Sequence, residues 1–281
     1  MKKIIAAAVA TAFVAPVMAA DVTLSGSAEF NMNDVNGTTT TATDTIFSVK
    51  ASTETANGLS VSADINVASN DNTVAGDGSD SVTVAGPFGS LDLGDTSSAA
   101  DKFDDRNDYG KLNGVATTAG DAAVGWTLPA LVEGATVYVS HAADGGEGDK
   151  HTGVAIQYSA GPVSVAYAKN TEEADNSDLT YVGATVTFQG LSVSVEQMED
   201  EAGSSAAKID EDVIGAKYAM GDVTVFMANK ENKTGGTKDA EVSSYGLHYN
   251  LGCGVTFFIE ASQDDLDDTA DSTGAGIVMA F

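Results

Sequence analysis

Apolar and polar residues alternate along this chain from residue 22 to the C-terminus, in segments of about ten residues. One face of the first segment, VTLSGSAEFNM, carries Val22, Leu24, Ala28, Phe30 and Met32. A period of two is typical of β-strands, whereas the 3.6-residue spacing of amphipathic helices is not visible in the sequence. The pattern recurs in about sixteen segments, so the sequence predicts an all-β protein.

The connections alternate between short glycine-containing turns and long stretches rich in Asp, Asn, Ser, Thr and Gly, which include residues 33–44 and 231–241. This alternation is expected when antiparallel strands run up and down in sequence order, with the tight turns at one end. One face of each strand is rich in Ala and Val, and the other face is small and polar. A polar interior requires water and an apolar exterior requires lipid, so the pattern predicts a transmembrane β-barrel of sixteen strands around an aqueous channel.

The first residues have a different character. Two lysines, an apolar run from Ile4 to Val14 and small residues up to Ala19 predict a secretory signal peptide over residues 1–19. The apolar run is too short for a membrane-spanning helix. The expected mature protein is a single barrel domain over residues 20–281.

The chain has 41 acidic and 13 basic side chains, a net charge of −28 at pH 7. Such a charge argues against binding to nucleic acid, which needs a basic surface, and attracts cations. The single cysteine, Cys253, excludes an intramolecular disulfide. Neither a nucleophile–base arrangement nor a phosphate-binding loop stands out, so no enzymatic activity is expected.

Several segments together resemble the Gram-negative general-diffusion porins, in particular the short Rhodobacter-like porins. These segments are ADVTLSGSAEF after the leader, the GPFGSLDLGD hairpin, the long segment after it, and the C-terminal strand ending in Phe281. The resemblance implies an outer-membrane homotrimer of 16-stranded barrels with short periplasmic turns, long acidic extracellular loops and passive diffusion of small hydrophilic solutes. It also implies that the third long loop folds into the channel and narrows it.

By position, that loop runs from Asp95 to Gly120. Its charged residues are the expected constriction residues: Asp95, Asp101, Lys102, Asp104, Asp105, Arg106, Asp108 and Lys111. In the family, an acidic loop faces basic residues on the barrel wall. Arg106 is the only arginine of this chain, so the basic side of such a filter is depleted here.

Alternation along the strands places a second set of charges on the inner wall: Glu29, Lys50, Asp64, Asp92, Glu196, Lys217, Lys230 and Glu260. A net negative lining concentrates cations and repels anions, which predicts a weakly cation-selective pore. Three other functions stay open: a solute-specific porin, a plugged surface barrel such as an adhesin, and a secreted soluble β protein with Ca²⁺-binding loops. Few aromatic residues face the lumen (Tyr138, Phe226 and Phe258), which favours a non-specific pore over a solute-specific one.

No cofactor is expected to be required. The acidic run QDDLDD has hard oxygen ligands that could hold Ca²⁺ or Mg²⁺ loosely, although solvated loop charge is the simpler interpretation. The carboxylates concerned are Asp264, Asp265, Asp267 and Asp268.

The final segment, GAGIVMAF, is expected to be the last strand, with Ile277, Met279 and Phe281 facing lipid. It must pair with VTLSGSAEF because a barrel cannot leave an unpaired edge in hydrocarbon. The resemblance adds that the terminal aromatic residue is a signal for the outer-membrane insertion machinery. The other expected partners are outer-membrane lipid, lipopolysaccharide, small solutes and cations.

Overall fold

The computed structural model describes residues 21–70, 73–76, 80–112, 120–142, 150–173, 177–201, 207–266 and 271–281. The predicted signal peptide, residues 1–19, lies outside this part of the chain. The first nine strands are β1 (Asp21–Val35), β2 (Thr38–Glu54), β3 (Ser60–Asn70), β4 (Thr73–Gly76), β5 (Ser81–Gly86), β6 (Gly89–Ser97), β7 (Asp121–Thr127), β8 (Ala135–Ala142) and β9 (His151–Ala160). The others are β10 (Val163–Glu172), β11 (Asp178–Phe188), β12 (Leu191–Glu201), β13 (Ile209–Met220), β14 (Val223–Thr234), β15 (Thr237–Gly252), β16 (Val255–Asp264) and β17 (Ser272–Ala280).

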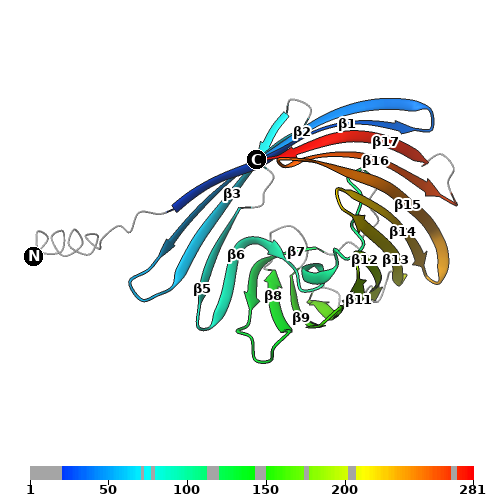
Figure 1. The fold of residues 1–281 in the computed structure, drawn as a ribbon. Helices are drawn as coiled ribbons and strands as arrows, with labels where there is room; N and C mark the ends of the chain where they lie inside the picture. Colours follow the sequence, from blue (N-terminus) through cyan, green and yellow to red (C-terminus); the bar gives the residue numbers. More distant parts are fainter. Residues whose placement is uncertain are drawn as a thin grey trace, which may run out of the picture.

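The strands form a closed antiparallel barrel (Figure 1). In the described part of the chain, β4 pairs only with the end of β3, while the other sixteen strands each pair with two neighbours around the barrel. Closure comes from β17, which pairs with β1 so that Ile277 lies opposite Phe30. The main chain of Phe281 continues this ladder by exchanging two hydrogen bonds with Gly26. The predicted 16-stranded barrel is therefore confirmed.

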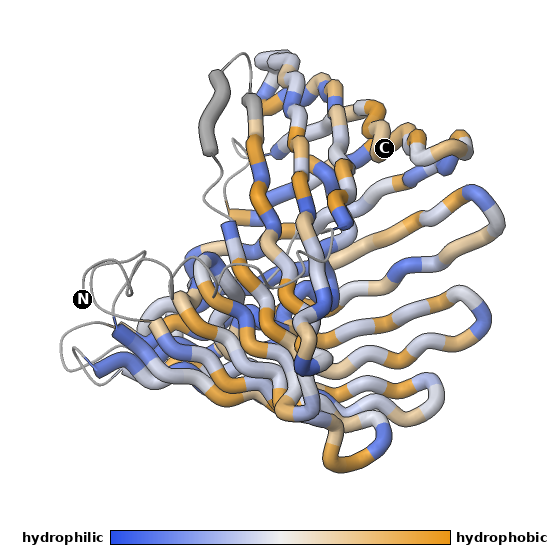
Figure 2. The backbone as a smooth tube through the Cα atoms, turned by 90° about the vertical axis from the view of Figure 1, so that its left-hand side faces the viewer, coloured by the Kyte–Doolittle hydropathy of each residue, from blue (hydrophilic) through white to orange (hydrophobic). Residues whose placement is uncertain are grey.

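Hydropathy alternates along the strands (Figure 2), and many large apolar side chains of the strands are exposed. Ile214 is 55% exposed and Met227 is 64% exposed on the outer face, although both are large and apolar. The inner face instead buries polar side chains such as Ser140 and Ser194. This inside-out distribution is that of a barrel with lipid outside and water inside.

Two connections that the sequence pattern suggested to be long loops are mostly strand. β1 and β2 continue to a two-residue turn, Asn36-Gly37, in which both residues have positive φ (51° and 77°). β14 and β15 likewise meet at Gly235-Gly236, with φ values of 59° and 79°. Both pairs have the backbone of the tight hairpin turns whose twist matches that of paired strands. The threonine-rich flanks are therefore paired strand rather than loop.

Helix is almost absent from the described residues. The one helical element is a short 3-10 turn, η1 (Asp101–Phe103). Nothing helical in the described part of the chain is long and apolar enough to cross a membrane.

Candidate functional site

The segment after β6 turns into the barrel and lies against its inner wall (Figure 1). We call its described part, residues 98–112, loop 3. Its first turn is bound to β8 and β10. The Tyr138 hydroxyl donates to the carbonyl oxygen of Ser97 (2.6 Å), and the amide of Ala99 donates to Ser140 Oγ (2.8 Å). The Asn170 side chain donates to Ser98 Oγ at 2.9 Å. Loop 3 therefore starts as a fixed element of the wall.

Arg106 is the main side chain that joins the middle of loop 3 to the wall. Its guanidinium donates to Tyr181 Oη, Thr185 Oγ1 and Gln157 Oε1 at 2.9–3.1 Å, and to Ser164 Oγ at 3.4 Å. These partners lie on β9, β10 and β11.

The close approach of Arg106 requires glycine on β11. A Cβ at Gly183 would lie 2.1 Å from the Tyr181 hydroxyl and 2.5 Å from Arg106 Nε. Both distances are below any van der Waals contact, so any larger residue would displace this pair of side chains.

Glu196 on β12 accepts hydrogen bonds from the same part of loop 3. Its carboxylate receives the amide of Arg106 (3.1 Å) and the side-chain amide of Asn107 (2.7 Å). The Tyr181 hydroxyl lies 2.9 Å from Glu196 Oε1 and 2.7 Å from the carbonyl oxygen of Phe103. Glu196 is only 3% exposed. It was predicted as a wall charge, and it lies on the wall, but its carboxylate holds the loop instead of facing the channel.

Glu260 on β16 holds the far end of loop 3 in the same manner. Its two oxygens accept the amides of Lys111 and Leu112 at 2.7 and 2.8 Å. His248 Nε2 lies 2.8 Å from the same carboxylate, and Glu260 is 2% exposed. Hydrogen bonds to a charged acceptor are stronger than neutral ones, so the two buried glutamates are strong attachment points.

Burial changes the acid–base properties of the loop carboxyl groups. Burial raises the pKa of Asp101, and the neighbouring carboxylates of Asp121 and Asp105 add to this effect. Burial likewise raises the pKa of Asp108, helped by Asp105. Asp104 is the extreme case: burial, then the charges of Asp101, Asp105 and Glu196, raise its pKa to about 8. One of its oxygens, Oδ1, has no hydrogen-bond partner among the residues that the structure describes. Asp104 therefore keeps its proton at neutral pH in the docked loop.

We expect loop 3 to dock less firmly as the pH rises, because the docked Asp104 binds a proton that the released carboxyl, with an ordinary pKa of 3.8, has lost. The bound proton stabilises the docked loop fully below pH 3.8. This stabilisation decreases between pH 3.8 and about pH 8, and above about pH 8 it is lost. In single-channel recordings, closing events should become more frequent as the pH rises from about 5 to about 8, and no further above that.

The D104N variant should lose most of this pH dependence, with smaller contributions remaining from Asp101 and Asp108, whereas D222N, which changes a carboxylate in the turn between β13 and β14, should keep it. An unchanged pH dependence in D104N would contradict the assignment.

The other predicted wall charges also lie at inward strand positions, and most have partners. Lys50 pairs with Asp64 across β2 and β3 at 3.1 Å, and Lys230 pairs with Glu211 at 3.1 Å. Lys217 lies over the ring of Tyr109 in loop 3, 4.8 Å from its centroid. Asp92 accepts from Thr83 Oγ1, and Glu29 accepts from the Asn31 side chain. The predicted loop residue Asp95 instead belongs to β6, beside an irregularity in the β6–β7 register, so the loop proper begins later than the sequence suggested.

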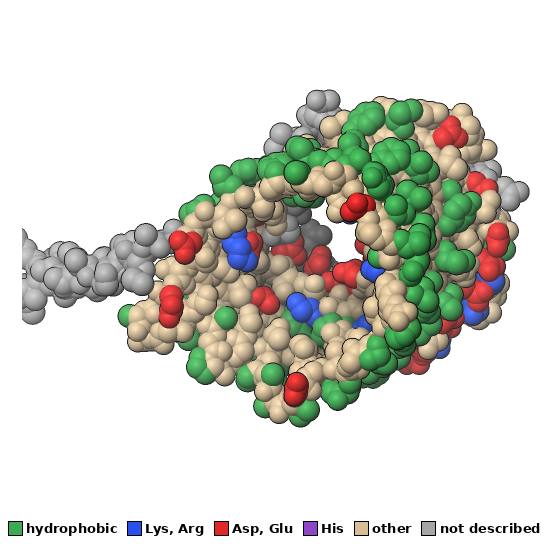
Figure 3. Space-filling view, viewed as in Figure 1, with side chains coloured by type: hydrophobic (Ala, Val, Ile, Leu, Met, Phe, Trp, Pro, Cys, Tyr) green, Lys and Arg blue, Asp and Glu red, His purple; other side chains and the backbone are tan. Residues whose placement is uncertain are grey.

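Among the described residues, loop 3 contacts β8 to β14 and β16, whereas β2 and β3 lie on the other side of the barrel (Figure 1). Figure 3 shows an opening through the barrel with acidic side chains around it. The exposed charged side chains of the loop are Asp105, Asp108 and Lys111, whereas Arg106 faces the wall. The charges available to a permeating solute are therefore fewer than the full predicted set.

The sequence did not identify the residues that receive loop 3. Tyr138, Tyr181 and Asn170 are buried and bind it, but each looks like an ordinary member of an alternating strand. One feature of the sequence could have indicated this surface. A glycine at an inward strand position, such as Gly183, is typical of a place where another segment approaches closely.

The predicted divalent-ion residues lie at and beyond the end of β16. The carboxylate of Asp264 accepts the amide of Leu266, and the amide of Asp265 donates to the carbonyl oxygen of Glu241. Asp267 and Asp268 lie outside the described residues. In the described ranges, no three His, Cys, Asp or Glu side chains are grouped as a metal site.

Comparisons with known proteins agree with this geometry. A family model described as Gram-negative porin matches residues 6–269. A triple mutant of the Rhodopseudomonas blastica porin is similar in structure, with a TM-score of 0.74 at 19% identity, covering 93% of this chain and 100% of that one. A porin structure refined at 1.8 Å gives a TM-score of 0.76 with the same identity and coverage. At 19% identity these likenesses concern the fold alone. No curated protein sequence matches this chain significantly.

Proposed function

Because this chain belongs to the Gram-negative porin family, we propose that it forms a water-filled outer-membrane channel through which small hydrophilic solutes and ions diffuse passively. The observation that carries the proposal is the position of loop 3, which is fixed to one side of the inner wall by buried side chains and leaves a passage beside it (Figure 3). The proposal includes export through a signal peptide cleaved after Ala19, assembly as a homotrimer, and no required cofactor.

We further propose that the channel weakly prefers cations. Loop 3 exposes Asp105, Asp108 and Lys111, which leaves one negative charge in excess. The inner faces of β1, β2, β3 and β6 carry Lys50 and at least six carboxylates: Asp21, Glu29, Asp44, Glu54, Asp64 and Asp92. An excess of negative charge on both sides of the passage raises the local cation concentration, and salt screens this effect over about 10 Å at 0.1 M.

Reversal potentials of the purified channel in a KCl gradient test this preference. We expect a higher permeability to K⁺ than to Cl⁻ and a weaker preference at high salt. The D105N/D108N variant should shift the permeability ratio toward anions. The control D34N/E201Q removes two carboxylates from the outer face and should leave the ratio unchanged. A wild-type preference for Cl⁻ would refute cation selectivity without affecting the channel proposal.

A solute-specific porin is the nearest alternative, and the inner aromatic residues argue against it. Tyr138 and Phe258 are fully buried, and Phe226 is 6% exposed beneath Tyr109 of loop 3. None of the three offers an open ring surface to a sugar in the passage. Regular conductance steps without saturation by sugars would support the general channel, and the absence of any steps would support a plugged surface barrel.

A further inference from the structure

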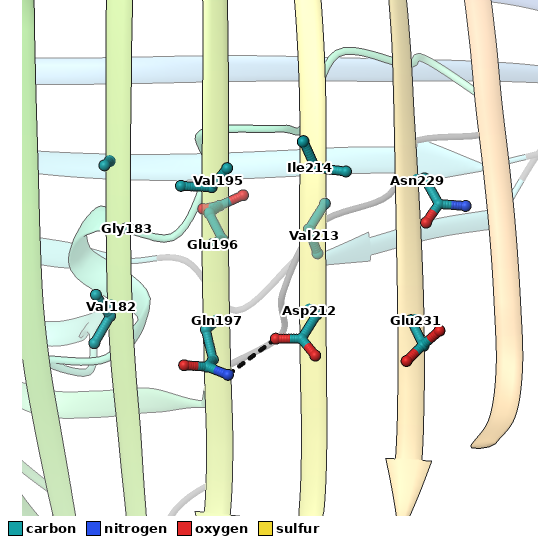
Figure 4. Close-up of a pocket in the computed structure, with 11 residues that line it drawn as sticks. Val182, Gly183, Val195, Glu196, Gln197, Asp212, Val213, Ile214, Asn229 and Glu231 are labelled. Atoms are coloured by element: carbon teal, nitrogen blue, oxygen red, sulfur yellow. Dashed lines mark hydrogen bonds between the residues drawn. The ribbon is translucent and has the colours of Figure 1, made fainter.

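The wall that receives loop 3 carries no strand carboxylate between the loop and the short turns, although the chain has 41 acidic side chains. In the described residues of β8 to β14, each carboxylate within a strand lies level with loop 3 or beyond it, toward the other end of the barrel. They are Glu172, Asp178, Glu196, Glu199, Asp200, Glu201, Asp210, Glu211, Asp212 and Glu231. In Figure 4, Asp212 and Glu231 lie toward that end of β13 and β14, and Glu196 on β12 is the labelled carboxylate nearest to the short turns. On the side of the turns, the described acidic residues of this sector lie in the connections themselves, at Glu133 and Asp222.

Hydroxyl groups replace carboxylates on this part of the wall. Thr185 Oγ1 lies 3.0 Å from Ser194 Oγ, which also binds the Tyr109 hydroxyl of loop 3 at 3.2 Å. The hydroxyls of Thr187 and Ser192 lie 2.9 Å apart, one row nearer to the short turns, and Thr187 is exposed. We call the inward residues of β9 to β12 on this side of loop 3 the hydroxyl shelf: Gln157, Ser159, Ser164, Thr185, Thr187, Ser192 and Ser194. The hydroxyl shelf offers hydrogen-bond donors without negative charge.

Lys217 borders the hydroxyl shelf with a positive charge. It lies opposite Ser192 in the pairing of β12 with β13, its side chain is exposed, and Nζ is 4.8 Å from the centroid of the Tyr109 ring. The other inward lysines of the strands, Lys50 and Lys230, each pair with a carboxylate at 3.1 Å, whereas Lys217 forms no ion pair in the described part of the chain. Its ammonium group is therefore available to a solute.

Arg106 supplies a second positive charge at the edge of the shelf nearest to loop 3. Its four hydrogen bonds to the wall occupy four of the five N–H groups of the guanidinium, and all four acceptors are uncharged. The second hydrogen of Nη2 has no acceptor among the described residues. Glu196, which is 3% exposed, offsets part of the charge of Arg106 from behind the loop. The guanidinium therefore keeps one donor and part of its positive charge for the shelf.

The wall on the other side of the barrel has the opposite charge. On the side of the short turns, the inner faces of β1, β2, β3 and β6 carry one lysine, which is paired, and four carboxylates: Asp21, Glu54, Asp64 and Asp92. β2 and β3 lie across the barrel from β11 and β12 (Figure 1). The positive side of this part of the lumen is therefore the side of loop 3. This is the reverse of the arrangement that the resemblance to general-diffusion porins implied, in which basic residues face the loop.

We propose that Lys217 and the hydroxyl shelf bind the carboxylate group of zwitterionic solutes, such as free amino acids, and that the channel passes these solutes faster than uncharged solutes of the same size. The carboxylate accepts hydrogen bonds from the Lys217 ammonium group and from the hydroxyls of Thr187 and Ser192, while the ammonium group of the solute stays in the acidic remainder of the lumen. The negative lining repels an anion, whereas a zwitterion has no net charge to repel. Because the shelf is exposed, binding is weak and permits release. The inference rests on the proposed function, since the shelf meets solutes only if the barrel conducts them.

Swelling of liposomes that contain the protein, in alanine and in its isomer lactamide, tests the proposal. The isomers have the same atoms, but alanine is a zwitterion and lactamide is uncharged at neutral pH. After subtraction of the rate in protein-free liposomes, wild type should admit alanine at least about twofold faster than lactamide, which is the effect expected for a contact with an exposed charge. K217Q should bring the rates for alanine and lactamide close together, and K217R, which keeps the charge, should retain most of the difference. The control K169Q removes an exposed lysine from the outer face of β10 and should leave the ratio of the rates unchanged.

Equal wild-type rates for alanine and lactamide would refute the proposal, and so would an equal ratio of the rates in K217Q and wild type. A change of both rates by the same factor in K217Q would indicate an altered width of the passage, and would also count against binding. An equal decrease of the ratio in K169Q would assign the effect to net charge and not to the shelf. Absence of lactamide uptake by wild type refutes the proposed function, whereas uptake of both solutes at equal rates refutes only this inference.

Discussion

Replacing Arg106 by methionine is expected to release the middle of loop 3 and to turn a steady channel into one that closes frequently. The substitution removes four side-chain hydrogen bonds to β9, β10 and β11. The hydroxyl oxygen of Tyr181 and Oε1 of Gln157 lose the hydrogen bonds that they accept from Arg106. Hydrogen bonds of a charged group contribute about 1.5–3 kcal/mol each. Because about 1.4 kcal/mol changes an equilibrium tenfold, closing events should be at least about tenfold more frequent in single-channel recordings.

Two variants show whether the hydrogen bonds of Arg106 cause this effect. R106K keeps the charge but has only three donors on one nitrogen, so it should give an intermediate closing frequency. D105N alters an exposed neighbour in the same loop and should close as rarely as wild type. If R106M conducted steadily, the attachment of loop 3 would depend on the two glutamates rather than on the arginine.

The fold was predictable because the membrane imposes it on every strand. With water inside and lipid outside, each strand must alternate, and this makes the period of two visible from β1 to β17. The ends of the strands were less predictable. The Asn36-Gly37 and Gly235-Gly236 turns were read as parts of long loops, although such pairs are strong hairpin signals. The threonines and charged residues beside them have no apolar face because these strand ends reach beyond the hydrocarbon.

The site was predictable only in part. Alternation assigned Glu196 and Glu260 to the inner wall, but it gives the face of a residue and not what covers that face. Whether an inward carboxylate meets water or a loop depends on the path of loop 3, and that path depends on contacts between residues about 90 and 150 positions apart. Arg106 shows the same limitation, since its sequence position suggested a charge facing the channel and the fold directs it to the wall.

Deleting Phe281, or replacing it by alanine, is expected to reduce the protein in the outer membrane to a small fraction of the wild-type amount without impairing export. The physical role of the residue in the folded barrel is modest: its main chain extends the β1–β17 ladder at Gly26, and its ring is 59% exposed on the outer face. Nine further residue pairs join the two strands, from Ser27 opposite Ala280 to Val35 opposite Ser272. A large loss in cells would therefore point to recognition of the terminal aromatic residue during insertion.

Refolding of the purified chain into detergent separates recognition from closure of the barrel. F281A keeps the main-chain pair with Gly26, so it should refold in detergent nearly as well as wild type while failing to accumulate in the outer membrane. F257A is the matched control, because Phe257 is also an outward aromatic residue, 37% exposed, on the neighbouring strand β16. It loses a similar apolar surface but leaves the terminus intact, and should accumulate normally. Equal losses in F257A and F281A would mean that the apolar outer surface, and not the position of the terminal residue, determines insertion.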